Sequence, residues 1–70
     1  MEESYYRFSF EGHTIYGWGT EGEAEAFMRL LAERPRAGSC GAHRLKTPEE
    51  IAGIPLGEKV IDLEISLAMR

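Results

Sequence analysis

Apolar and polar residues alternate from Tyr6 to Phe10, a spacing that predicts a β-strand because successive side chains of a strand point to opposite faces. Aromatic and β-branched residues are concentrated in two runs, residues 4–10 and residues 14–18. Between the runs, Glu11 and Gly12 suit a two-residue turn in which glycine supplies a positive φ. The N-terminal part of the chain is therefore predicted to form a β-hairpin.

The position of this turn decides which side chains share a face of the hairpin. It places Tyr5 opposite Trp18, Tyr6 opposite Gly17, and Phe8 opposite Ile15. The face expected to be buried carries apolar side chains, namely Tyr6, Phe8, Phe10 and Ile15. The opposite face mixes aromatic, basic and hydroxyl side chains, namely Tyr5, Arg7, Ser9, Thr14, Tyr16 and Trp18.

A capping box predicts the start of the main helix. In Thr20-Glu21-Gly22-Glu23 the threonine hydroxyl can accept a backbone N–H of the first turn, and Glu23 can reach back to the capping residue. Apolar residues then recur at helical spacing as far as Leu31. The helix is expected to stop at Arg34, because a residue before proline is pushed out of the helical region.

The second half of the chain shows weaker patterns. Residues 42–46 predict a short strand, and Thr47-Pro48-Glu49-Glu50 forms a second capping box that opens a short helical turn. Residues 60–67 alternate in polarity and predict a half-buried strand. A C-terminal helix is the alternative, because Ile61 and Ile65 lie four positions apart.

The order of elements indicates one α+β domain spanning residues 1–70. We expect a small antiparallel sheet, made of the N-terminal hairpin, a C-terminal strand and a possible short middle strand, with one main helix packed on one face, in the order ββα(β)β. A single helix covers one side of such a sheet. The other side is expected to be open.

Composition narrows the possible functions. The 70 residues carry a net charge of −4 and are 43% apolar, which favours a folded domain and makes long polyanions such as DNA poor partners. With one cysteine and no zinc-type ligand spacing, we expect no disulfide, metal or cofactor. The acidic start of the chain resembles neither a signal peptide nor a membrane span, so a cytoplasmic location without a membrane partner is expected by default.

The hairpin supplies the leading functional hypothesis. Aromatic rings beside an arginine are typical of protein interfaces, and here the group consists of Tyr5, Arg7, Tyr16 and Trp18. A chain this short also buries a thin core, which favours association. The sequence thus predicts a small acidic protein-binding module, an adaptor, accessory subunit or inhibitor, that docks on another protein or a second copy. The alternative is a different register, or a C-terminal segment that covers the rings.

Two further groups of residues point to other classes of function. Cys40 and His43, with arginines nearby, could form a thiol nucleophile and its base in an enzyme or redox protein, but an incidental surface cysteine is the simpler explanation. A basic stretch could bind an anion, or could merely complement a helix C-terminus and aid solubility; it comprises Arg34, Arg36, Arg44 and Lys46. We expect no enzymatic activity.

In size and acidity the chain resembles the small inhibitors carried by phages and mobile elements, anti-CRISPR proteins among them. The resemblance is one of composition and assigns no role to any residue. It implies a further hypothesis, in which an acidic surface mimics nucleic acid and blocks a nucleic-acid enzyme.

Overall fold

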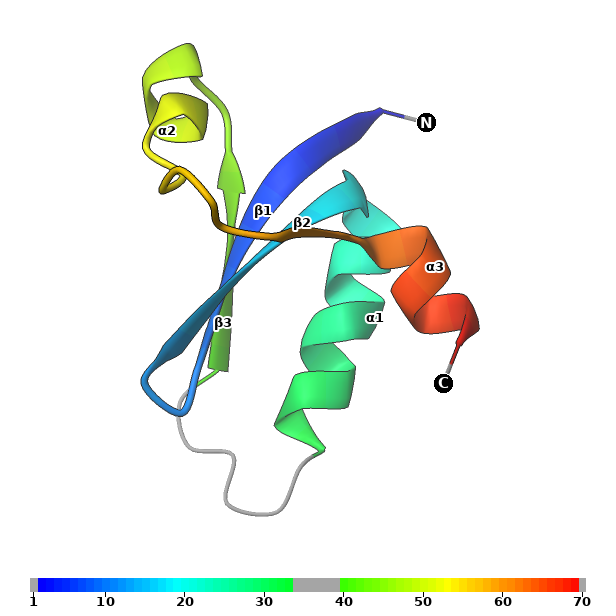
Figure 1. The fold of residues 1–70 in the computed structure, drawn as a ribbon. Coiled ribbons are helices and arrows are strands. Elements are labelled where there is room, and N and C mark those ends of the chain that lie inside the picture. Colours follow the sequence, from blue (N-terminus) through cyan, green and yellow to red (C-terminus); the bar gives the residue numbers. More distant parts are fainter. Residues whose placement is uncertain (1, 34–39, 70) are drawn as a thin grey trace.

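Four strands and three helices make up the part of the chain that the computed structural model describes, residues 2–33 and 40–69 (Figure 1). In chain order they are β1 (Glu3–Phe10), β2 (His13–Thr20), α1 (Glu21–Ala32), β3 (Cys40–Leu45), α2 (Pro48–Ala52), β4 (Val60–Asp62) and α3 (Leu63–Ala68).

The hairpin forms in the predicted register. Glu11 and Gly12 both adopt positive φ, 50° and 76°, as the tight turn requires. Tyr5 pairs with Trp18 and Phe8 with Ile15, so the division of side chains between the two faces is confirmed. Local turn chemistry is sufficient to fix this part of the sheet.

The four strands lie in the order β3-β1-β2-β4. β1 is antiparallel to β2 and β3, whereas β4 is parallel to β2. The sheet is therefore mixed, and the expectation of a purely antiparallel sheet is corrected in this respect. The cause is topological: β3 and β4 occupy opposite edges, and the chain crosses a face of the sheet between them, as parallel strands require.

Both capping boxes form as predicted. At the start of α1 the Glu23 backbone N–H donates to Thr20 Oγ1 at 3.2 Å, and the Thr20 N–H donates to Glu23 Oε1 at 2.9 Å. At α2 the same reciprocal pair joins Thr47 and Glu50. The predicted stop of the main helix at Arg34 lies outside the described residues.

The C-terminal segment differs from its leading prediction. Strand β4 ends at Asp62, whose carboxylate accepts the N–H groups of Glu64 and Ile65 at 3.1 and 3.3 Å and so caps α3. The strand prediction is wrong from Leu63 onward, and the helical alternative is correct there. Apolar residues that alternate along a strand also lie four positions apart, so the same pattern fits a strand or a helix. The aspartate cap favours the helix.

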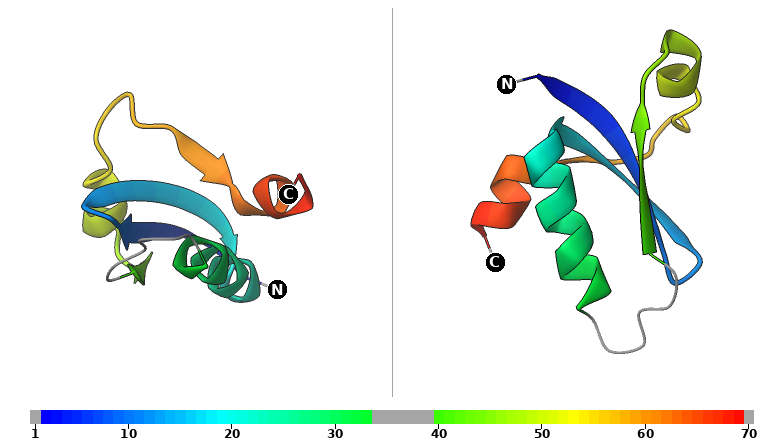
Figure 2. Two further views of the ribbon diagram at one scale, coloured as in Figure 1. Left: turned by 90° about the horizontal axis from the view of Figure 1, so that it is seen from below. Right: turned by 180° about the vertical axis from the view of Figure 1, so that it is seen from behind.

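Two helices share one face of the sheet, which we call the inner face. α1 and α3 lie there side by side, while α2 and the connection to β4 lie on the opposite, outer face (Figure 2). The core on the inner face joins β1, α1 and α3 and consists of Tyr6, Phe8, Phe10, Ala24, Leu31 and Leu63. The expectation of one helix on the sheet is corrected, because α3 joins α1 on the inner face. The expectation of a bare opposite face is also corrected, because the crossing segment lies there.

Close packing on the inner face explains two glycines of β2. A Cβ on Gly17 would lie 2.8 Å from Leu63 Cδ2, and one on Gly19 would lie 3.0 Å from Leu63 Cβ. Leu63 fills the space over these glycines and has no exposed surface. The glycines therefore serve the docking of α3.

Candidate partner-binding surfaces

The four side chains predicted to bind a partner all lie on the outer face. The rings of Tyr5 and Trp18 pack together, with centroids 4.6 Å apart and planes inclined by 59°. Tyr16 pairs with Arg7 in the register of the hairpin. All three rings are half-buried and Arg7 is exposed. The aromatic group is neither sealed inside the domain nor fully open.

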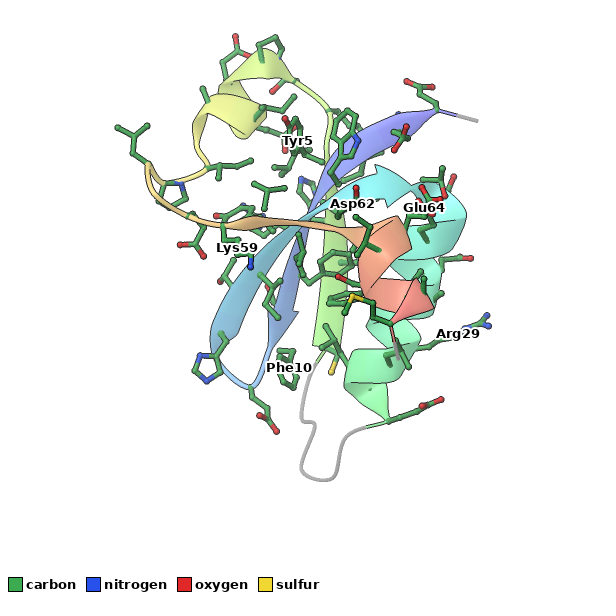
Figure 3. All side chains as sticks on the ribbon, turned by 45° about the vertical axis from the view of Figure 1, so that its right-hand side comes forward. Tyr5, Phe10, Arg29, Lys59, Asp62 and Glu64 are labelled. Atoms are coloured by element: carbon green, nitrogen blue, oxygen red, sulfur yellow. The ribbon has the colours of Figure 1, made fainter. Side chains whose placement is uncertain are left out.

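Leu45 also belongs to the outer face, and the sequence analysis did not identify it. It pairs with Tyr5 across β1 and β3, yet only 3% of its surface is exposed. Figure 3 shows Tyr5 beside α2, at the end of the sheet that this helix overlies. The alternation of β3 with β1 would have revealed that Leu45 shares the face of the rings.

Helix α2 is tied to the outer side of β3 through Glu50. One carboxylate oxygen, Oε2, lies 2.7 Å from His43 Nε2, and the other accepts the Lys46 backbone N–H at 3.1 Å. The hydrogen bond from His43, aided by the Lys46 N–H, lowers the pKa of Glu50 to about 2. A five-residue helix is too short to be stable alone, so this attachment positions it.

A hollow of about 670 Å³ lies between the hairpin and α2. We call this cavity the outer hollow. Its apolar lining consists of Tyr5, Trp18, Leu45 and Ile51. Charges of both signs surround it: Glu2 and Glu3 come from the start of the chain, and Arg44 and Lys46 from the end of β3. The arrangement suits an apolar side chain flanked by charged ones.

The connection on the outer face carries a protruding leucine. Residues 55–58 form a tight turn in which the Glu58 N–H donates to the Pro55 carbonyl at 3.1 Å and Gly57 has φ 85°. Leu56, at the tip of this turn, is fully exposed. Among the described residues, Leu56 is the most exposed of the large apolar side chains.

The structure separates the candidate thiol from its candidate base. Cys40 pairs with Phe10 on the inner face and packs, half-buried, against the core. His43 pairs with Arg7 on the outer face and contacts Glu50 instead. Residues three apart in a strand point to opposite faces, so a nucleophile and base at this spacing would need a helix or a turn.

The predicted basic stretch is only partly described, because Arg34 and Arg36 lie outside the described residues. Arg44 is engaged by β1: its Nε donates to Ser4 Oγ at 3.1 Å and its Nη2 lies 3.2 Å from Glu2 Oε1. Lys46 follows the end of β3 and is exposed. Within the described chain, the two cations therefore share one end of β3 but differ in their partners.

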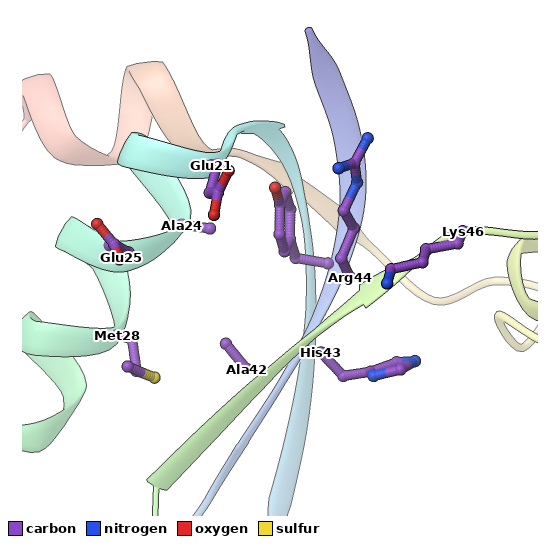
Figure 4. A pocket seen from close by; sticks show the side chains of 9 residues that line it. Glu21, Ala24, Glu25, Met28, Ala42, His43, Arg44 and Lys46 are labelled. Carbon is purple, nitrogen blue, oxygen red and sulfur yellow. The ribbon is translucent and has the colours of Figure 1, made fainter.

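A second hollow, the inner groove, separates α1 from β3 and has a volume of about 440 Å³ (Figure 4). α1 contributes Glu21, Glu25 and Met28 to one wall, and β3 contributes Ala42 and Arg44 to the other. Tyr6 lies between them; its burial raises the pKa of the phenol, an effect that Arg44 opposes and Glu21 reinforces. The sequence analysis did not identify this groove, since it depends on how far α1 lies from β3.

No group of three His, Cys, Asp or Glu side chains in residues 2–33 and 40–69 is placed to hold a metal ion. No helix in the same residues has the length and apolar character needed to cross a lipid bilayer. Comparison with protein-family models, curated proteins and solved structures finds no match to this chain.

Proposed function

We propose that this chain is a small protein-binding module that docks through its outer face, and that a second copy of the chain occupies that face. The observation that carries the proposal is the pairing, on one face, of an apolar hollow with a protruding apolar side chain. The outer hollow is open, and Leu56, on the connection that crosses the same face, is fully exposed.

The chemistry of the two features is complementary. Burying a leucine that is exposed in the free domain contributes about 1.5–3 kcal/mol, and the rings of Tyr5 and Trp18 offer the kind of surface enriched at interface hot spots. Glu58 and Lys59 follow Leu56 along the chain, and acids and bases both surround the hollow. Each charge beside the leucine can therefore meet an opposite charge on the partner copy.

Reciprocal insertion would close the assembly. If Leu56 of each copy enters the outer hollow of the other around a twofold axis, the same patch is used twice and a dimer results. A non-reciprocal contact would instead produce longer chains of molecules. The thin core of a 70-residue domain adds a reason for the association, since a dimer removes further apolar surface from water.

Sedimentation equilibrium over a range of concentrations tests this proposal. The wild type is expected to show a reversible monomer–dimer equilibrium, and Leu56→Ser is expected to weaken the dimer by at least about tenfold, because the lost burial exceeds 1.4 kcal/mol. Trp18→Ser is expected to act in the same direction through the hollow.

The matched control is Met69→Ser, which removes another largely exposed apolar side chain, next to α3 on the other side of the sheet. It is expected to leave the dimer unchanged. A wild type that stays monomeric at every concentration, or a Leu56→Ser variant that dimerises as strongly as the wild type, would contradict the proposal.

A further inference from the structure

Strand β3 offers a free edge. It lies at the end of the strand order. β1 pairs with one edge of β3, and among the described residues no strand pairs with the other edge. An unpaired edge presents backbone N–H and C=O groups that an extended segment can pair with. β4, the other edge strand, has three residues and runs directly into α3, whereas β3 has six residues and contains no proline.

The inner groove lies beside this edge. Ala42 pairs with Phe8 and so faces the side that α1 covers, yet it is exposed, because α1 does not close over β3. Figure 4 shows the side chains of α1 and of β3 on opposite sides of the groove. A strand added next to β3 would point every second side chain toward the α1 wall.

The charge of that wall selects the partner. Glu21 and Glu25 are exposed, and neither forms an ion pair or side-chain hydrogen bond with the described residues. Arg44, on the other wall, is held by Ser4 and Glu2 of the β1 side and leans away from the free edge. Lys46 also lines the groove, so two carboxylates stand against one unpaired cation, and the net charge beside the free edge is negative.

We propose that the free edge of β3 takes up an extended segment of another protein as an additional strand. A basic side chain of the segment is directed to Glu25, and an apolar side chain two positions later is directed to Met28. α1 runs in the direction opposite to β3 (Figure 1), so a segment antiparallel to β3 passes Glu25 before Met28. The order of the two side chains follows from this geometry.

A second copy fits this edge less well. Two β3 strands paired antiparallel about Ala42 would place the Arg44 of one copy opposite Cys40 of the other. Cys40 pairs with Phe10 at one end of β3. Arg44 pairs with Tyr6 at the other end, where Glu21 lies. Such a dimer would bring no further cation to the two groove carboxylates, so charge favours a segment of different sequence.

Fluorescence anisotropy with a labelled, end-capped heptapeptide, Thr-Val-Thr-Lys-Thr-Ile-Thr, tests the proposal on the full wild-type chain. We expect saturable binding that weakens by at least about tenfold when the peptide's lysine is replaced by glutamate, because a like charge would then face Glu25. The Glu25→Lys variant is expected to reverse this preference. Glu49→Lys, an identical charge change at an exposed position of α2, is the matched control and is expected to keep it.

Amide hydrogen exchange locates the peptide. Binding is expected to slow exchange at alternate amides within residues 41–45, the ones directed to the free edge. Lack of binding, equal affinity for the lysine and glutamate peptides, or an unchanged preference in Glu25→Lys would overturn the proposal. So would protection of the same amides in a peptide-free dimer, which would assign the edge to a second copy.

Discussion

The inner and outer faces of the sheet are built from the same two central strands but reach different degrees of burial. On the inner face Phe8 and Leu63 have no exposed surface, whereas on the outer face Tyr5, Tyr16 and Trp18 all remain half-buried. Helix length accounts for the difference: α1 has 12 residues and is joined by α3, while α2 has five. A chain of this size completes one layer of core, and the rings on its second face stay partly exposed.

The largest expected contrast between the faces is in stability. Phe8→Ala should lower the free energy of unfolding by about 3–5 kcal/mol, because it leaves a cavity in a closed core. That loss is comparable with the whole stability of a small domain, so the variant should be largely unfolded. Tyr16→Ala, on the outer face, should cost only about 1 kcal/mol, since the Tyr16 side chain is already partly exposed to water.

Urea denaturation followed by circular dichroism measures both variants. Equal losses from the two substitutions would show that the outer rings belong to the core after all. In that case the outer face could not be treated as a spare surface.

Two glycine substitutions are expected to change stability by intermediate amounts, one at a closely packed position and one at an open position. Gly17→Ala should destabilise the domain by about 1–3 kcal/mol, because its Cβ would meet Leu63 Cδ2 at 2.8 Å and Phe8 Cε2 at 3.2 Å. Gly22→Ala, in α1, meets no atom within 4 Å and should stabilise the helix by roughly 0.5–1 kcal/mol. Thermal unfolding of the two variants gives the signs directly; a stable Gly17→Ala protein would argue against close packing of α3.

The smallest effect concerns the attachment of α2, and it depends on pH. The pKa of Glu50 is lowered in the folded protein to about 2 from an ordinary 4.5, so its ionised form stabilises the fold above about pH 4.5. This contribution is lost as the pH falls from 4.5 toward 2. Wild type should therefore be more stable than Glu50→Gln at neutral pH, and the two should converge in acid.

Unfolding measurements at a series of pH values test this expectation, with Glu49→Gln as the matched control on the same helix. A Glu50→Gln variant whose deficit stays constant down to pH 2 would show that the carboxylate does not hold α2 to β3. We expect neither substitution to alter the packing of the core on the inner face.

Local signals in the sequence predicted much of this fold. The Glu11-Gly12 turn fixed the hairpin register, and the threonine and glutamate of each capping box fixed two helix starts. These features succeed because their partners lie within four residues or directly across a tight turn.

Features that depend on distant parts of the chain were not predicted. The side on which the chain crosses from β3 to β4 determines that Leu45 is covered and that Leu56 protrudes, and no short-range pattern encodes that choice. The same holds for α3, where Leu63 finds its place over Gly17 and Gly19 only once β2 is formed. Among the candidate sites, the aromatic group was predicted as a unit, whereas the hollow beside it and the inner groove emerged from the packing of helices.

Mixing the two interface variants tests most directly whether the outer face docks by inserting Leu56 into the outer hollow. Leu56→Ser keeps an intact hollow and Trp18→Ser keeps an intact leucine, so a mixture retains one of the two contacts of the dimer. Sedimentation equilibrium should show each variant alone as a monomer and the mixture as a weak heterodimer. Two variants that remain monomeric when mixed, while the wild type dimerises, would contradict this account of the outer face.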